Sequence, residues 1–116
     1  MIPKSLMKQA RQQGLLKTVG GHEHWHAGLL LIIAGNGMSS PDATSRQRSR
    51  AAFEALIGVA ERRGFVQSDD LRARIGRGDF GERTFMLARV AMDVPGEELN
   101  AALAEAGFNP HLSAGN

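Results

Sequence analysis

The longest apolar run of the chain extends from Trp25 to Gly35 and dominates its hydrophobic pattern. As a helix this run is apolar on every side, so it must lie inside a core or against another chain. The pattern predicts a helix over residues 22–35, with a buried strand as the competing interpretation of Leu29 to Ile33. Helix is favoured because no second strand-like run is available for pairing and the rest of the chain has helical periodicity.

Two glycines occur at a helical spacing within this run. Gly28 and Gly35 are seven residues apart and therefore share one face of the predicted helix. Because glycine has no side chain, another helix can approach that face closely. We therefore expect the apolar helix to be the centre of the fold, with other helices packed against it.

The hydrophobic pattern of the rest of the chain predicts further helices, and glycine or proline marks where they begin or end. They are expected over residues 3–13, 40–63, 68–76 and 82–92 and after Pro95. Residues 14–21 are expected to be a connector. The clearest start signal places a cap at Ser40 and the first helical residue at Pro41. In the helix of residues 82–92 the following side chains are expected to point mostly inward: Phe85, Met86, Ala88, Val90 and Met92.

The predicted fold class is all-α, with about five helices around the buried apolar helix near residues 22–35. A length of 116 residues indicates a single domain. Within it, residues 1–20 are expected to form a loose basic arm and residues 109–116 a frayed tail. Because the chain is small and rich in apolar surface, we expect a second copy to cover part of that surface, which makes the protein a homodimer.

Composition narrows the class of protein. The hydrophobic fraction of 42% is typical of a globular fold. The chain contains no cysteine, which excludes a disulfide scaffold and thiolate chemistry. The apolar run is shorter than the roughly 20 residues of a membrane-spanning helix, and the first turns lack the apolar segment of a secretory leader. We therefore expect a cytoplasmic protein with no membrane contact.

Charge is distributed unevenly along the chain. The formal net charge is +2, but residues 1–63 hold nine basic against four acidic side chains, and residues 64–116 hold five against eight. A basic half and an acidic half favour association with a charged partner or with a second copy.

The candidate chemistry is sparse. Serine, histidine and aspartate are present, but their spacing marks no catalytic triad, and no glycine-rich phosphate motif occurs. We expect no enzymatic activity and no cofactor. The residues His22, His24 and His26 form a cluster. On a helix His22 and His26 lie one turn apart and could share a metal ion, whereas on a strand all three histidines share one face.

The predicted function is regulatory binding to a partner protein, such as a transcription regulator or an enzyme complex, which the chain inhibits or modulates. An apolar helix face would supply affinity, and arginines would set orientation and association rate. The predicted contact residues are Leu29, Leu30, Ile33, Phe53, Leu56, Ile57, Arg46 and Arg50. One alternative is a basic DNA-binding regulator that uses Arg46, Arg50 and Arg62, or a helix-turn-helix in residues 68–92. A metal-binding protein based on the histidine cluster is the second alternative.

Overall fold

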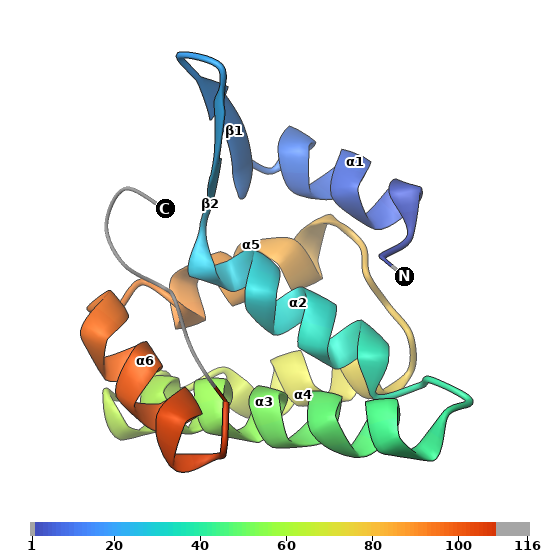
Figure 1. Cartoon of the computed structure of the whole chain (residues 1–116), viewed down its shortest axis with the longest axis vertical. Helices are drawn as coiled ribbons and strands as arrows, with labels where there is room; N and C mark the ends of the chain where they lie inside the picture. The colour runs from blue at the N-terminus through green and yellow to red at the C-terminus, as the bar shows by residue number, and fades with distance from the viewer. Residues whose placement is uncertain (1, 109–116) are drawn as a thin grey trace.

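The computed structural model describes residues 2–108, which form six helices and one two-stranded sheet. Figure 1 shows the helices gathered in one body with the sheet projecting from it. The elements in chain order are α1 (Lys4–Gln12), β1 (Leu16–Val19), β2 (His22–Trp25), α2 (Ala27–Gly37), α3 (Ala43–Arg62), α4 (Ser68–Gly76), α5 (Glu82–Ala91) and α6 (Gly96–Glu105). The expected helical class is confirmed, but the description all-α is wrong because of the sheet.

The sheet is an antiparallel hairpin in which Leu16 pairs with Trp25 and Val19 pairs with His22. The connector expected over residues 14–21 and the helix expected to begin at His22 are therefore both corrected. A two-residue turn joins the strands, and its glycines, Gly20 and Gly21, have φ of 58° and 81°. Glycine adopts positive φ without strain, so this dipeptide favours the tight turn that a hairpin needs.

From Ala27 onward the apolar run is helical, as predicted, and forms α2, whereas Trp25 at its start belongs to β2. This helix lies in the middle of the molecule, with α1 above it and α3 below it in the view of Figure 1. It packs against α3, α4 and α5. Its fully buried side chains include Leu29, Leu31 and Ile32. Other parts of this chain therefore bury most of the apolar surface of α2.

The glycine face of α2 allows the close packing that its spacing predicts. A Cβ atom on Gly28 would lie 3.0 Å from the carbonyl oxygen of Ala88 in α5. A Cβ atom on Gly35 would lie 2.7 Å from the Cγ2 atom of Ile75 in α4. A side chain at position 28 would press on the backbone of α5, and one at position 35 would displace the Ile75 side chain of α4, so the two glycines allow α4 and α5 to approach α2 closely.

The long helix α3 begins two residues later than the start signal indicates. Its cap is Asp42, whose Oδ2 atom accepts a hydrogen bond of 2.8 Å from the backbone N–H of Ser45. Ser40 and Pro41 lie in the preceding loop, and Ser40 Oγ accepts a hydrogen bond from the Asp42 N–H. An aspartate cap binds the free amide groups and also carries negative charge at the positive end of the helix.

The N-terminal segment contributes to the core. The side chains of Leu6, Ala10, Leu15 and Leu16 are all buried in the main apolar cluster. The loose arm expected for residues 1–20 thus includes four core residues. The frayed tail expected for residues 109–116 lies outside the described residues.

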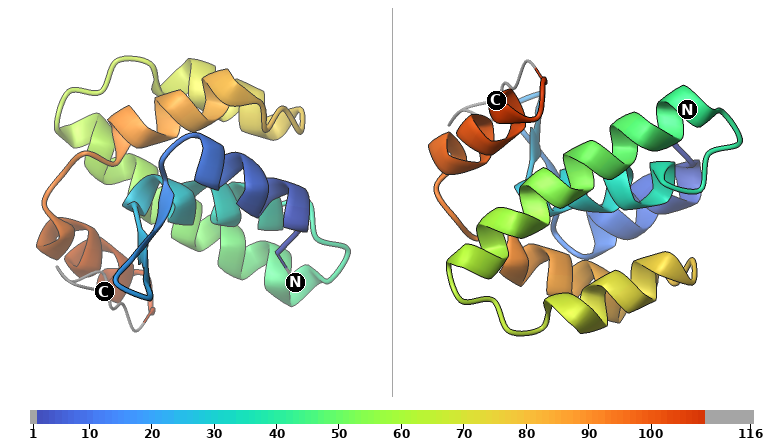
Figure 2. Two further views of the ribbon diagram at one scale, coloured as in Figure 1. Left: turned by 90° about the horizontal axis from the view of Figure 1, so that it is seen from above. Right: turned by 90° about the horizontal axis from the view of Figure 1, so that it is seen from below.

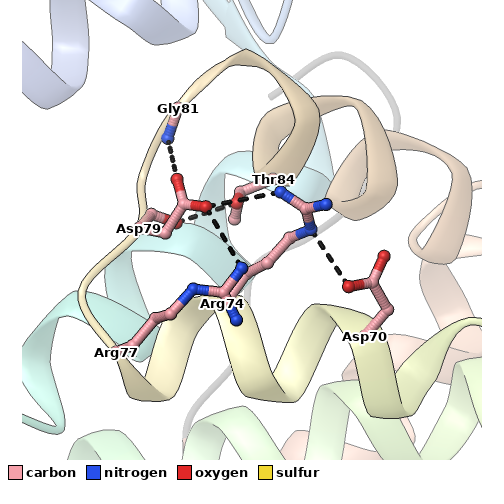
Figure 3. A network of polar contacts seen from close by, with 6 residues as sticks. All are labelled: Asp70, Arg74, Arg77, Asp79, Gly81 and Thr84. Atoms are coloured by element: carbon pink, nitrogen blue, oxygen red, sulfur yellow. Dashed lines mark hydrogen bonds and ion pairs between the residues drawn. The ribbon is translucent and has the colours of Figure 1, made fainter.

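The loop between α4 and α5 is held by a polar network (Figure 3). Arg74 joins Asp70 at 3.1 Å and Asp79 at 3.3 Å. Asp79 also accepts hydrogen bonds from the Gly81 N–H at its side chain and from the Thr84 hydroxyl at its backbone carbonyl. These contacts fix the start of α5 relative to α4.

Candidate interaction surface

The structure buries four of the six apolar residues that the sequence predicts as partner contacts. Leu29, Phe53, Leu56 and Ile57 lie in the main core, each with at most 1% of its surface exposed. Their side chains hold α2 against α3. The other two, Leu30 and Ile33, are only partly buried, which leaves part of each side chain free for a partner.

Ile33 lies in a groove between the start of α1, the end of α2 and the start of α3. The groove has a volume of about 520 Å³. Ile2, Leu6 and Ile33 contribute apolar side chains to the groove, and Asn36, Ser39, Ser40, Ser45 and Ser49 contribute polar ones. Gly37 and Pro41 complete its lining. We call this surface the α1–α2–α3 groove. It combines an apolar strip with hydroxyl and amide groups, which is a typical composition for a protein-binding site.

The first half of α3 carries Arg46, Arg48 and Arg50, which adjoin the groove residues Ser45 and Ser49 in the sequence but do not line the groove themselves. Arg46 donates a hydrogen bond of 2.8 Å to the Ser40 carbonyl, and Arg48 lies over the ring of Phe108 at 5.1 Å. None of the three belongs to an ion pair within residues 2–108. No acidic residue occurs between Asp42 and Glu54 in the sequence. These arginines therefore form no ion pair with the described part of the chain, although Arg46 is close enough to Asp42 to help lower the pKa of that carboxyl group, after the hydrogen bonds from Ser45.

The second half of α3 has the opposite character, because its charges are paired with other helices. Arg72 of α4 lies 2.7 Å from Glu54 and 3.3 Å from Glu61. Arg63 binds both carboxylate oxygens of Glu98 in α6. The right panel of Figure 2 shows α3 crossing the whole face, with α6 on one side and α4 on the other. In the described residues the second half of α3 has one arginine outside these ion pairs, Arg62, whereas the first half has three.

The three histidines do not form the arrangement expected on a helix. His22 and His24 lie on β2 and are exposed, whereas His26 caps α2. The prediction that His22 and His26 lie one helical turn apart is therefore wrong. Among residues 2–108, no group of three or more histidine, aspartate, glutamate or cysteine side chains is placed to hold a metal ion.

His26 has a structural role at the junction of β2 and α2. The Nδ1 atom of its imidazole accepts a hydrogen bond of 2.9 Å from the Gly28 N–H. The backbone N–H of His26 donates a hydrogen bond to the Leu15 carbonyl. Partial burial lowers the pKa of the imidazole below its ordinary value, and the Arg89 guanidinium lowers this pKa further. The Asp93 carboxylate acts in the opposite direction. The neutral imidazole is thus the form that caps the helix.

A second apolar surface lies on α5, where the inward orientation expected for Met86 and Val90 is wrong. These side chains are 46% and 61% exposed, one turn apart on the same face of the helix. Val66, which is 91% exposed, lines a groove together with Val90, Phe65 and Val94. Three of the six exposed large hydrophobic side chains in residues 2–108 are therefore on or beside α5.

The sequence could not show which α5 side chains point outward. Apolar residues occupy Phe85 to Ala88 without a break, so the helical period there does not single out one face. The structure resolves the ambiguity, because α5 packs against α2 and α4 and leaves its third face open.

No protein-family model matches this chain, and comparisons with curated proteins and with solved structures also give no match. None of the helices in residues 2–108 is long and apolar enough to cross a membrane.

Proposed function

We propose that this chain is a small regulatory protein that binds a partner protein in the α1–α2–α3 groove and modulates it. The observation that carries the proposal is an apolar groove beside a half-helix whose arginines have no ion-pair partner among the described residues. Apolar contact with Ile2 and Ile33 would supply affinity. The arginines would orient the partner and speed its approach.

The charge of the surface indicates which kind of partner segment fits. Residues 43–53 contain three arginines and no acidic side chain. A segment with glutamate or aspartate beside an apolar stripe would match both the groove and these cations. We therefore propose an acidic amphipathic segment of another protein as the occupant of the groove.

Binding of such a segment can regulate the protein that provides it. A segment held in the groove is not available to its other partners, so occupancy competes with the assembly or activity that the segment supports. We propose inhibition by this competition, with the regulatory chain acting as a homodimer.

Affinity capture from the source cells, with proteins quantified by mass spectrometry, tests the proposal. We expect the variant Arg46→Glu/Arg50→Glu to reduce a captured protein at least about tenfold, because two attractive charges become repulsive. The control Lys8→Glu/Lys17→Glu makes the same change in net charge away from the groove and should retain that protein. If both variants lost the captured protein equally, or if both retained it, the proposal would be contradicted.

Nucleic-acid binding is the second candidate, because the same unpaired arginines could contact phosphates. Such binding would weaken steeply with salt, since it depends on the release of counterions. Protein binding with an apolar component should persist at moderate salt. A titration of duplex DNA at two salt concentrations, with Arg46→Glu/Arg50→Glu as the comparison, separates the two candidates.

The helix-turn-helix alternative has less support in the geometry. α5 would be its recognition helix, which needs several polar side chains on its free face. That face presents Arg83 and Arg89, but it also presents the apolar side chains of Met86 and Val90.

A further inference from the structure

The open face of α5 has the character of a contact surface. Met86 and Val90 form an apolar stripe along it, and Val66 extends the stripe at one end. The stripe is flanked by exposed charged residues at both ends, with Glu82 and Arg83 at the start of the helix and Asp93 just after its end. Arg89 is also exposed beside the stripe, and its guanidinium donates a hydrogen bond to the Gln13 carbonyl of the same chain. This surface is distinct from the α1–α2–α3 groove, since it shares no lining residue with it.

We infer that a second copy of this chain covers this face, with the two α5 helices antiparallel. The positions of the charges argue for a second copy. Arg83 and Asp93 are equally far from position 88, which is also the midpoint between Met86 and Val90. In an antiparallel pair centred there, Met86 of one copy meets Val90 of the other, and each Arg83 lies level with an Asp93 of the other copy.

The same symmetry makes the surface complementary to itself. Two apolar contacts and two opposite-charge contacts form together, because a two-fold axis repeats each of them. A parallel pair would instead place like charges together at each level. This inference rests on the homodimer of the proposed function and names the face that the dimer uses.

Light scattering during size-exclusion chromatography tests the inference on the full chain. We expect a mass of twice the 12.5 kDa of one chain at about 100 µM, and the mass of one chain for Val90→Glu. The control Val19→Glu adds the same charge at an exposed position on the hairpin and should remain dimeric. A monomeric wild-type protein overturns the inference, and so does a dimer that Val90→Glu leaves intact. Circular dichroism of Val90→Glu, Arg83→Glu and Asp93→Lys must match wild type.

A charge-reversal experiment tests the antiparallel register. Arg83→Glu and Asp93→Lys each place like charges level with one another, so each variant alone should raise the dimer dissociation constant at least about tenfold. Mixed together, the two variants have opposite charges at both levels. We expect the mixture to form a heterodimer with an affinity close to that of wild type. If mixing the two variants does not restore dimer affinity, the antiparallel register is wrong.

These results are independent of partner binding. If Val90→Glu is monomeric but still captures the groove partner, the dimer face is supported and the groove proposal is unaffected. If the wild-type dimer behaves as expected but the groove variants change no captured protein, the dimer face stands and the proposed function fails.

Discussion

Single residues explain how closely this fold is packed. Gly28 is the clearest case, because the backbone of α5 lies where its side chain would be. Backbone cannot move aside as a flexible side chain can, so added volume must separate two helices. The spacing of Gly28 and Gly35 predicts the close approach, but only the structure shows which helices make it.

We expect Gly28→Ala to lower the free energy of unfolding by about 1–3 kcal/mol, the usual cost of overfilling a packed core. Gly58→Ala in α3 is the matched control. Its Cβ atom would meet only the flexible end of Arg62 at 3.3 Å. This control should raise stability by up to about 1 kcal/mol, because alanine favours a helix more than glycine does. Urea unfolding of both variants measures the difference, and a neutral Gly28→Ala would contradict the packing described above.

His26 makes stability depend on pH. The folded state lowers the pKa of His26, so near pH 6.5 and below, the unfolded chain binds this proton more readily than the folded chain does. Stability contributed by the neutral cap is therefore complete above the unfolded pKa of about 6.5, and it is lost as pH falls below that value. The opposing charge of Asp93 reduces the effect without reversing it.

Unfolding measured between pH 8 and pH 5 should show this loss in the wild-type protein. His26→Asn keeps a capping oxygen but does not titrate, so its stability should be nearly flat over that range. His22→Asn removes an exposed histidine and should keep the slope of the wild type. If the stability of His26→Asn fell with pH as steeply as that of the wild type, another titrating group would be responsible for the loss.

At the scale of elements, the hairpin is the part of the fold with the least support from the core. Of its eight strand residues only Leu16 is buried. Arg11 of α1 braces the hairpin with a hydrogen bond to Thr18 and an ion pair of 3.2 Å to Glu23. Both groups of the ion pair are exposed, so it contributes at most about 1 kcal/mol. The turn geometry should therefore matter strongly for this element.

We expect Gly20→Ala/Gly21→Ala to loosen the hairpin, because each alanine at positive φ costs about 1–2 kcal/mol. Because the two costs add, amide hydrogen exchange in β1 and β2 should become at least about 30-fold faster, while exchange in α2 stays slow. Gly20→Asn should behave like the wild type, since asparagine followed by glycine suits this turn. Unchanged exchange in the double alanine variant would mean that the turn is not what holds the strands together.

The elements differ in how far their sequence could predict them. Most helices have an apolar period or a clear end signal, such as Gly64 after α3, where φ is 92° and Phe65 folds back on the core. The hydrophobic pattern does not predict the hairpin, because its strands are four residues long and mostly polar and so lack the apolar alternation of a buried strand. Its one usable signal is the Gly20-Gly21 dipeptide.

At the scale of the whole molecule, the hydrophobic pattern does not distinguish core residues from residues of a contact surface. Sequence predicts that Leu29 and Phe53 are buried, but it does not say whether the covering atoms belong to the same chain. The structure shows that they do. Among residues 2–108 it leaves exposed apolar side chains on the hairpin, at Val19 and Trp25, and on two surfaces that also carry charges outside any ion pair. One is the α1–α2–α3 groove with its arginines, and the other is the open face of α5.

The two surfaces lie on different sides of the same core, so one molecule could use both at once. α5 contributes to the second surface and takes no part in lining the groove. We therefore expect that the monomeric variant Val90→Glu still captures the groove partner. Capture would be weaker only if the partner itself is multivalent, because two linked sites then bind together.

Photocrosslinking in the source cells tests the central claim, binding in the groove, most directly. A photoreactive residue replaces Ser45, which lines the groove, or its exposed neighbour Thr44, which is not among the lining residues. We predict a covalent adduct between the Ser45 probe and an acidic segment of a second protein, with little or none from the Thr44 probe. Equal adducts from both positions, or none from Ser45, would contradict the account.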